Sequence, residues 1–220
     1  MTTTRANEVL QILKNTFPTP RWPSSKRNPF QTLIVTIISQ NTASNNTAKA
    51  FEKLSKKFQI TPEALAKANE KDIADTLRVA GLFRNKAKTI KRVSRIVLEQ
   101  FNGSLDFVHS MSLYEARKTL LAMPGVGPKT ADVVLLFSAK KPTIPVDTHV
   151  NRVSKRLRLA PINADYENVR MTLQSLYAPE DFLAVHLLFI MLGRRYCKAL
   201  KPICKKCPVN SLCPSKRTED

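Results

Sequence analysis

One stretch of the chain, residues 120–150, holds a glycine-containing turn, a lysine and a carboxylate close together in sequence. Pro124-Gly125-Val126-Gly127 interrupts two apolar helical patterns, and its two glycines permit positive φ angles and leave no β-carbon between a ligand and the backbone amides. Pro128 suits the first position of a helix, where its missing N–H costs nothing, so Lys129 falls at the positive end of that helix. The pattern predicts a turn that binds a phosphate or another anion.

A second candidate group is the carboxylate of Asp147, which follows Lys141-Pro142 and precedes a helical pattern. That pattern places Val150, Val153 and Leu157 on one apolar side, and Asp147 or Thr148 can cap its first turn. Two interpretations of Asp147 follow from the residues alone. Its side chain is either a helix cap or a carboxylate with a chemical role.

All four cysteines of the chain lie near its C-terminus, with the spacing C-x6-C-x2-C-x5-C. Four thiols gathered in one proline-rich loop of a cytoplasmic protein predict a metal site, because four thiolates complete either a tetrahedral zinc ion or one iron–sulfur cube. Isolated structural cysteines would have no reason to gather there. Spacing does not decide between zinc and a cluster. The predicted ligands are Cys197, Cys204, Cys207 and Cys213.

Composition limits the class of protein. The chain has 220 residues, of which 43% are hydrophobic, and 36 Lys and Arg against 17 Asp and Glu give a net charge of +19. So basic a protein is expected to bind a polyanion, nucleic acid before a membrane surface. No stretch approaches eighteen apolar residues, and the N-terminal segment lacks the features of a secretion signal. We therefore expect a cytoplasmic protein without disulfides or a membrane partner.

The remaining chain reads as helices. Five glycines against fourteen prolines favour helices separated by short turns over strands joined by hairpins. The apolar, β-branched run from Phe30 is the ambiguous case, and we interpret it as a central helix because the segments around it all show helical spacing. The proline-containing segment 17–30 is expected to be a linker. The helix predicted over 84–101 has a basic face, which is either solvated or a DNA footprint: Lys86, Lys88, Lys91, Arg92 and Arg95.

Several motifs together resemble one family. LxxMPGVGPKTADVVL, PVDTHVxRVxxRL, LGRRYC and the cysteine spacing occur in the order found in the endonuclease III branch of the helix-hairpin-helix DNA glycosylases, from about Pro29 to Cys213. The resemblance implies an all-α, two-domain fold with DNA in the cleft between the domains. It implies a six-helix module over 28–141, and a second domain formed by 1–27 and 142–220. It also implies that the loop 197–213 carries a [4Fe-4S] cluster, not zinc.

The resemblance further implies roles for single residues. Lys129 matches the catalytic lysine of the family and Asp147 its catalytic aspartate. Gln40 matches a residue that fills the space left by an extruded nucleotide, and Leu82 matches a wedge between bases, although a leucine there can also simply pack in a loop. The hairpin residues Gly125, Val126 and Gly127 are expected to contact DNA.

These roles imply a bifunctional DNA glycosylase and AP lyase that acts as a monomer on double-stranded DNA containing a damaged base or an abasic site. We expect oxidised or saturated pyrimidines to be its substrates, and a cytoplasmic location, on the nucleoid in a prokaryote. One alternative keeps the fold but removes mismatched thymine or uracil. The other is a non-catalytic module that binds damaged DNA, in which Lys129 only contacts phosphate. Strand cleavage at an abasic site separates the enzyme from the module.

Overall fold

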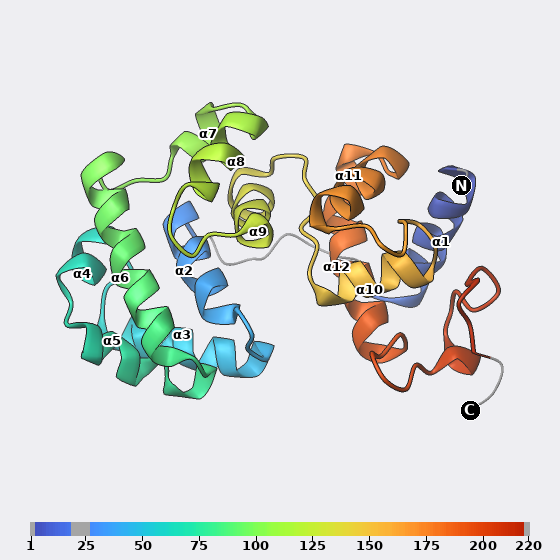
Figure 1. Ribbon diagram of the computed structural model, residues 1–220, viewed down its shortest axis with the longest axis horizontal. Coiled ribbons are helices and arrows are strands. Elements are labelled where there is room, and N and C mark those ends of the chain that lie inside the picture. Colours follow the sequence, from blue (N-terminus) through green and yellow to red (C-terminus); the bar gives the residue numbers. More distant parts are fainter. Residues whose placement is uncertain (1–2, 19–26, 218–220) are drawn as a thin grey trace. The chain divides into compact units, whose positions relative to one another are not determined.

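The computed structural model describes residues 3–18 and 27–217, and in those residues it contains twelve α-helices and three short 3-10 helices but no strand (Figure 1). The all-α fold class is therefore confirmed. Much of the linker predicted over 17–30 lies outside the described residues. The chain divides into two compact units, residues 24–141 and residues 1–23 with 142–220, which are described separately below.

The unit 24–141 is built around a central apolar helix, α2(Pro29–Ser39). This helix begins with a capping box: the Asn28 side chain accepts a hydrogen bond from Gln31 N at 2.8 Å, and the Gln31 side chain accepts one from Asn28 N. Pro29 occupies the first helical position, as its fixed φ angle favours. Leu33, Ile34 and Ile37 are fully buried. Strong caps and burial on most sides explain why a β-branched run forms a helix here.

Around α2 lie helices whose start and stop signals follow the sequence. Thr61 caps the helix that begins at Pro62, Asn69 caps the next, and Ser112 forms a second capping box with Glu115. Six of the eight α-helices in the described part of this unit have seven residues or more. In order, the helices that accompany α2 are α3(Ser44–Lys57), α4(Pro62–Lys67), α5(Glu70–Thr76), η1(Arg78–Ala80), α6(Phe83–Gln100), α7(Phe107–Ser110), α8(Leu113–Leu121) and α9(Pro128–Ala139).

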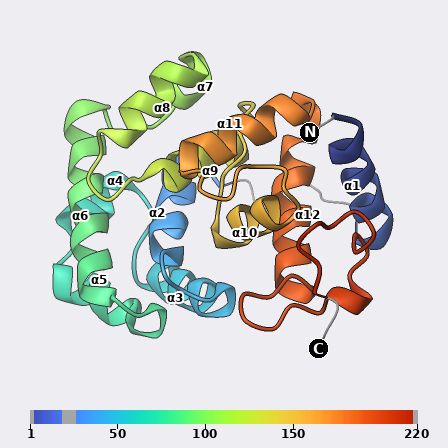
Figure 2. The same cartoon turned by 45° about the vertical axis from the view of Figure 1, so that its right-hand side comes forward.

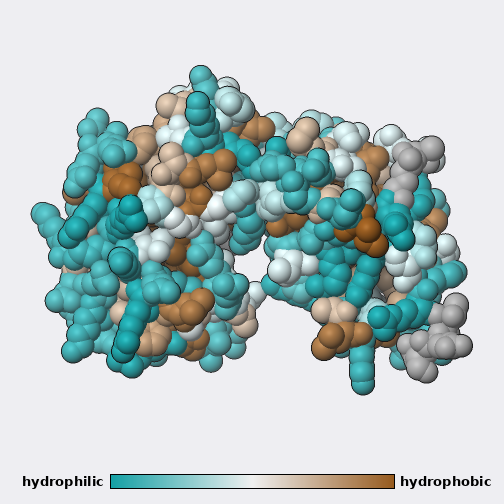
Figure 3. Space-filling view, viewed as in Figure 1, coloured by the Kyte–Doolittle hydropathy of each residue, from teal (hydrophilic) through white to brown (hydrophobic). Residues whose placement is uncertain are grey.

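Helix α6 corrects one interpretation of the sequence. Its apolar face packs against α4 and α5, and hydrophilic side chains cover most of its outer surface in Figure 3. Lys86 was assigned to that basic outer face, but its side chain points into the unit and the residue is only 4% exposed. Helical spacing places residue 86 at the edge of the apolar stripe, beside Ala87 and Ile90. The lysine is buried because three oxygen atoms are available to its ammonium group.

The other unit combines the N-terminal helix α1(Thr3–Thr16) with α10(Thr148–Arg156), α11(Tyr166–Leu176), η2(Pro179–Asp181) and α12(Phe182–Arg195), and ends in a cysteine-containing loop that includes η3(Cys204–Lys206) (Figure 2). Helix α12 is its central element and packs against α1 and α10. Val9, Val153 and Phe189 are fully buried in their shared core. No single helix in the described ranges is long and apolar enough to cross a membrane, and only the bent pair Tyr166–Leu176 and Pro179–Arg195 meets that test together.

Candidate functional site

The turn between α8 and α9 is a tight hairpin whose two glycines have different roles. Gly125 has φ of 75°, and a β-carbon at this position would lie 2.5 Å from the Thr89 side chain on α6, so only glycine fits. Gly127 has an ordinary φ of −87°, so the expected positive φ occurs at only one of the two glycines. A β-carbon on Gly127 would meet nothing within 4 Å. Gly127 thus keeps open the space in front of the start of α9.

Val126 anchors this hairpin to the core of the unit. Its side chain is only 5% exposed and belongs to the core of the unit, and its N–H donates to Met123 O at 3.2 Å. These are the contacts of a packing residue. Val126 therefore holds the exposed glycines on either side of it in place.

Lys129 is the second residue of α9, directly after Pro128 and the exposed Gly127. Its side chain is half-buried and lies in the first turn of the helix, where unpaired backbone N–H groups and the helix dipole create positive potential. This positive potential attracts anions and disfavours positively charged groups. The structure thus gives Lys129 the position that the sequence predicted, at the start of a helix and beside an open turn.

The side chain of Gln40 is hydrogen-bonded to the hairpin. Gln40 ends α2, and its Nε2 atom donates to Gly125 O at 3.1 Å and to Thr130 Oγ1 at 3.3 Å. The expected position of Gln40 was based on resemblance alone, and nothing in its local sequence indicated a partner 85 residues away. These two hydrogen bonds join Gln40 to the hairpin and to the first turn of α9.

Leu82 is exposed and its backbone is strained. Its side chain is 58% exposed, so it does not pack in the core. Its φ of 46° places it in the left-handed region, which costs a residue with a β-carbon roughly 1–2 kcal/mol. Strain of this kind concentrates at binding sites. The loop thus holds an apolar side chain in water at the start of α6.

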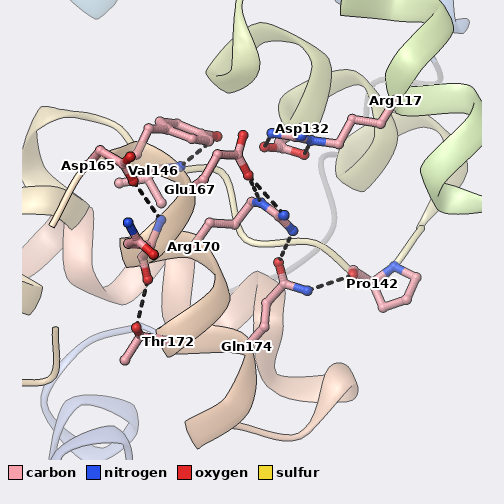
Figure 4. Close-up of polar contacts among 11 residues, drawn as sticks. Arg117, Asp132, Pro142, Val146, Asp165, Glu167, Arg170, Thr172 and Gln174 are labelled. Atoms are coloured by element: carbon pink, nitrogen blue, oxygen red, sulfur yellow. Dashed lines mark hydrogen bonds and ion pairs between the residues drawn. The ribbon is translucent and has the colours of Figure 1, made fainter.

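A buried ion pair ties together the two helices of the hairpin, and the sequence did not predict it. Arg117 of α8 donates from Nε to Asp132 Oδ1 at 2.9 Å and from Nη2 to Oδ2 at 3.2 Å (Figure 4). The Asp132 side chain is fully buried and that of Arg117 is 15% exposed. A single carboxylate in the apolar run of α9 was the available signal, because buried carboxylates require a partner. The two-point contact fixes the distance between α8 and α9.

Asp147 belongs to the other unit and caps α10. Its Oδ1 atom accepts hydrogen bonds from His149 N at 2.9 Å and Val150 N at 2.8 Å, so the expected capping is observed. The carboxylate is half-buried and lines a pocket of about 280 Å³ together with Asn151 and Tyr166. Burial lowers the pKa of the neighbouring His149 below its usual value. The cap fixes one oxygen of Asp147 and orients the carboxylate at the rim of this pocket.

The four cysteines line a single cavity of about 240 Å³ in the C-terminal loop, and all four are free thiols. Burial raises the pKa of Cys207 to about 11 and also raises that of Cys213, and the negative charges of the other thiolates add to both effects. In the described residues no group of three or more His, Cys, Asp or Glu side chains is arranged to hold a single metal ion.

Arginines of α10 hold this loop. Arg156 Nη1 lies 3.4 Å from Cys197 Sγ and donates to Lys198 O at 2.6 Å, while Arg152 Nε donates to Cys197 O at 2.8 Å. The guanidinium groups thus place positive charge beside the thiols. Thiolates in this cavity would be favoured by these contacts and opposed by one another.

Residues 34–179 match the HhH-GPD superfamily base excision DNA repair protein family. The chain is 37% identical to endonuclease III of Sulfolobus acidocaldarius over 188 residues, which cover 85% of this chain and 82% of that protein. It is also 37% identical to endonuclease III of Thermotoga maritima over 196 residues, with 88% and 87% covered. Endonuclease III of Escherichia coli (strain K12) is 34% identical, with 97% and 96% covered.

Solved structures give the same result. A trapped covalent intermediate of an endonuclease III with DNA superposes with a TM-score of 0.86 at 31% identity and covers 98% of this chain and 97% of that one. A thermostable thymine-DNA glycosylase shares the fold, with a TM-score of 0.76 at 22% identity, over 96% of each chain. The chain therefore belongs to the endonuclease III family of the HhH-GPD superfamily, and is a base excision repair DNA glycosylase and lyase.

Proposed function

We propose that this enzyme removes oxidised or saturated pyrimidines from double-stranded DNA and cuts the strand 3′ to the resulting abasic site, with Lys129 as the nucleophile and Asp147 as the catalytic carboxylate. The observation that carries the proposal is the position of Lys129 in the first turn of α9, behind the open turn at Gly127. The hairpin amides offer a phosphate the hydrogen bonds that a helix N-terminus provides. A phosphate held there brings the sugar of the same nucleotide chain close to the lysine.

The reaction divides into two steps at Lys129. The neutral amine attacks the sugar C1′ atom, the bond from C1′ to the base breaks, and the base leaves with that electron pair and takes up a proton. After the nitrogen has lost one proton, its lone pair forms a double bond to C1′ while the C1′–O4′ bond breaks and O4′ takes up a proton. The resulting protonated imine allows a proton to leave C2′ and the 3′ phosphate to leave with its bonding electrons. The helix dipole at the start of α9 disfavours the ammonium form, and so helps to keep the amine available.

Asp147 supports the first step. Positive charge develops on the sugar as the base leaves, and a fixed carboxylate stabilises that charge or accepts the amine proton. The hydrogen bonds from His149 N and Val150 N orient the carboxylate before substrate arrives. A preoriented group pays no reorganisation cost during the reaction.

Gln40 and Leu82 act before any bond breaks. A base inside a duplex is out of reach of a lysine, so the nucleotide must be extruded, and badly stacked lesions cost least to extrude. We assign Leu82 as the wedge that separates the bases, because its apolar side chain is 58% exposed. We assign Gln40 as the plug of the vacated space, because its side chain is hydrogen-bonded to the hairpin.

Cys197, Cys204, Cys207 and Cys213 would hold a [4Fe-4S] cluster. A cube of iron and sulfide needs thiolates around a cavity, whereas zinc needs them around a point. The cavity of about 240 Å³ lined by all four cysteines fits the first requirement. When bound, the cluster serves to hold the loop. Lysines of this loop are exposed and then face the DNA backbone: Lys198, Lys201, Lys205 and Lys206.

The net charge of +19 supports double-stranded DNA as the partner. We propose that the enzyme acts as a monomer in the cytoplasm, on the nucleoid if the source is prokaryotic. We further propose that the unit 24–141 is the six-helix module of the family and that the other unit is its cluster domain.

A panel of duplexes, each with one defined lesion, tests the substrate class. The enzyme should cut duplexes that contain an oxidised or saturated pyrimidine much faster than those with a thymine or uracil mismatch. Matched duplexes with a preformed abasic site serve as the control for the lyase step. Preference for the mismatches would show that this chain uses the same fold for the alternative substrate class.

A further inference from the structure

We infer that Lys86 is a positioning residue for base extrusion, because its buried ammonium joins the segment that carries Gln40 to the segment that carries Leu82. This inference rests on the proposed function, in which Gln40 is the plug and Leu82 the wedge. Lys86 touches neither substrate nor the reacting atoms. Its effect passes through the backbone of the two segments.

The three donor hydrogens of the ammonium are matched by three oxygen atoms. Nζ of Lys86 donates to Ile38 O at 2.8 Å, to Ala80 O at 2.9 Å and to Thr42 Oγ1 at 2.5 Å. Two of these partners, Ile38 and Thr42, enclose Gln40 in the sequence, and the third, Ala80, lies two residues before Leu82. One side chain thus fixes both segments.

Thr42 completes the connection. Its Oγ1 atom lies 2.5 Å from Ala80 O and 3.1 Å from Gln40 O, and it accepts a hydrogen bond from the Lys86 ammonium. The carbonyl of Ala80 thus accepts hydrogen bonds from both Thr42 and Lys86. The two segments meet through this polar cluster.

The backbone around the cluster is strained in both segments. Asn41 has φ of 53° and Leu82 has φ of 46°, both in the left-handed region. Such conformations persist only where surrounding contacts hold them. Lys86 donates to Thr42, which follows Asn41, and to Ala80, two residues before Leu82, and so supplies a restraint in both segments.

Burial of an ammonium group costs free energy, because the charge loses its contact with water. The residue is 4% exposed, and burial lowers the pKa of Lys86 below its usual value. The ammonium donates hydrogen bonds to two carbonyls and one hydroxyl, which satisfy its donors without neutralising its charge. We attribute the lysine to the need for three hydrogen bonds that meet at one atom.

Lys86→Met tests the inference, because methionine keeps the length and the packing but donates no hydrogen bond. Two substrates are compared: a duplex with a base-paired oxidised pyrimidine, which must be extruded, and an abasic site in single-stranded DNA, which needs no extrusion. The variant should lose at least tenfold in cleavage of the duplex lesion and less than about twofold on the single strand. Lys53→Met, which removes an exposed lysine of α3, should change neither rate.

Thr42→Val is the second variant, and keeps the inference testable if Lys86→Met folds poorly. Valine retains the β-branched shape and removes the hydroxyl at the centre of the cluster. It should also reduce the ratio of duplex to single-strand cleavage, and the double variant should lose less than the two single losses combined because they act on one network.

The outcomes separate the inference from the proposed function. Equal loss on both substrates in a folded variant, or no change in the ratio in either variant, overturns the positioning role. A wild-type chain that cuts neither substrate overturns the proposed function itself, and the inference with it.

Discussion

Gln40 Nε2 donates a hydrogen bond to Gly125 O at 3.1 Å, so the proposed plug is attached to the hairpin that we propose to bind DNA. The second bond, to Thr130 Oγ1, reaches the residue that follows Lys129. The proposed plug is therefore joined by hydrogen bonds both to the hairpin and to the first turn of the helix that carries the proposed nucleophile. Extrusion of the nucleotide and its capture by the lysine are expected to be coupled through this contact.

Gln40→Ala should weaken the capture of a base-paired lesion and leave strand cleavage at an abasic site in single-stranded DNA nearly intact. The alanine cannot fill the vacated stack, but the single strand has no stack to fill. Cleavage rates on the two substrates measure the effect, with Gln59→Ala as a control at an exposed glutamine. Equal losses on both substrates would contradict the plug role.

Asp147→Asn separates the two roles of this carboxylate. Asparagine caps a helix about as well as aspartate, so the free energy of unfolding should change little, while Asp147→Ala should cost about 1 kcal/mol. Base removal should slow by orders of magnitude in both variants, because neither has a negative charge to stabilise the sugar. Urea unfolding and single-turnover base release are the measurements. Base removal by Asp147→Asn at the wild-type rate would reduce Asp147 to a helix cap.

Arg117→Met should destabilise the protein by roughly 3–5 kcal/mol, the usual cost of removing one partner from a buried ion pair. The loss is large because the Asp132 side chain is fully buried and would lose both hydrogen bonds from the guanidinium. Urea denaturation measures it. Lys56→Met breaks the exposed pair with Glu52 and should have little effect. A small decrease in the free energy of unfolding of Arg117→Met would show that other contacts stabilise the buried Asp132 carboxylate.

The purified protein should contain about four iron atoms per chain and absorb visible light. Removal of the iron should loosen the loop 197–213 and weaken DNA binding, because its exposed lysines would lose their fixed positions. Elemental analysis and binding titrations test both points. Colourless protein that contains zinc and no iron would contradict the cluster assignment.

Much of the fold follows from local signals in the sequence. Helical spacing and the Pro and Gly breaks predict nearly every helix, because caps and amphipathic faces are properties of neighbouring residues. The run from Phe30 is the instructive case. Its propensity favours a strand, but burial on most sides and the capping box of Asn28 with Gln31 produce a helix.

The polar contacts across the fold could not be predicted in this way. Lys86 was expected on the basic outer face of its helix, because the three oxygens that bury it come from residues 38, 42 and 80 and meet only in the folded chain. The pairing of Arg117 with Asp132 has the same origin. Local patterns place each of these side chains on a helix, but the partner depends on how the helices pack.

Reduction of the enzyme–DNA intermediate with borohydride tests the central claim most directly. Borohydride converts an imine to a stable amine, so wild-type protein should become permanently attached to lesion-containing or abasic DNA. Lys129→Gln removes the nucleophile and should abolish this attachment while it retains DNA binding, since the amides of Gly125 and Gly127 belong to the backbone. Lys140→Gln, at the other end of α9, is the control and should be trapped like wild type. Undiminished trapping of Lys129→Gln would contradict the account, and show that another amine attacks the sugar.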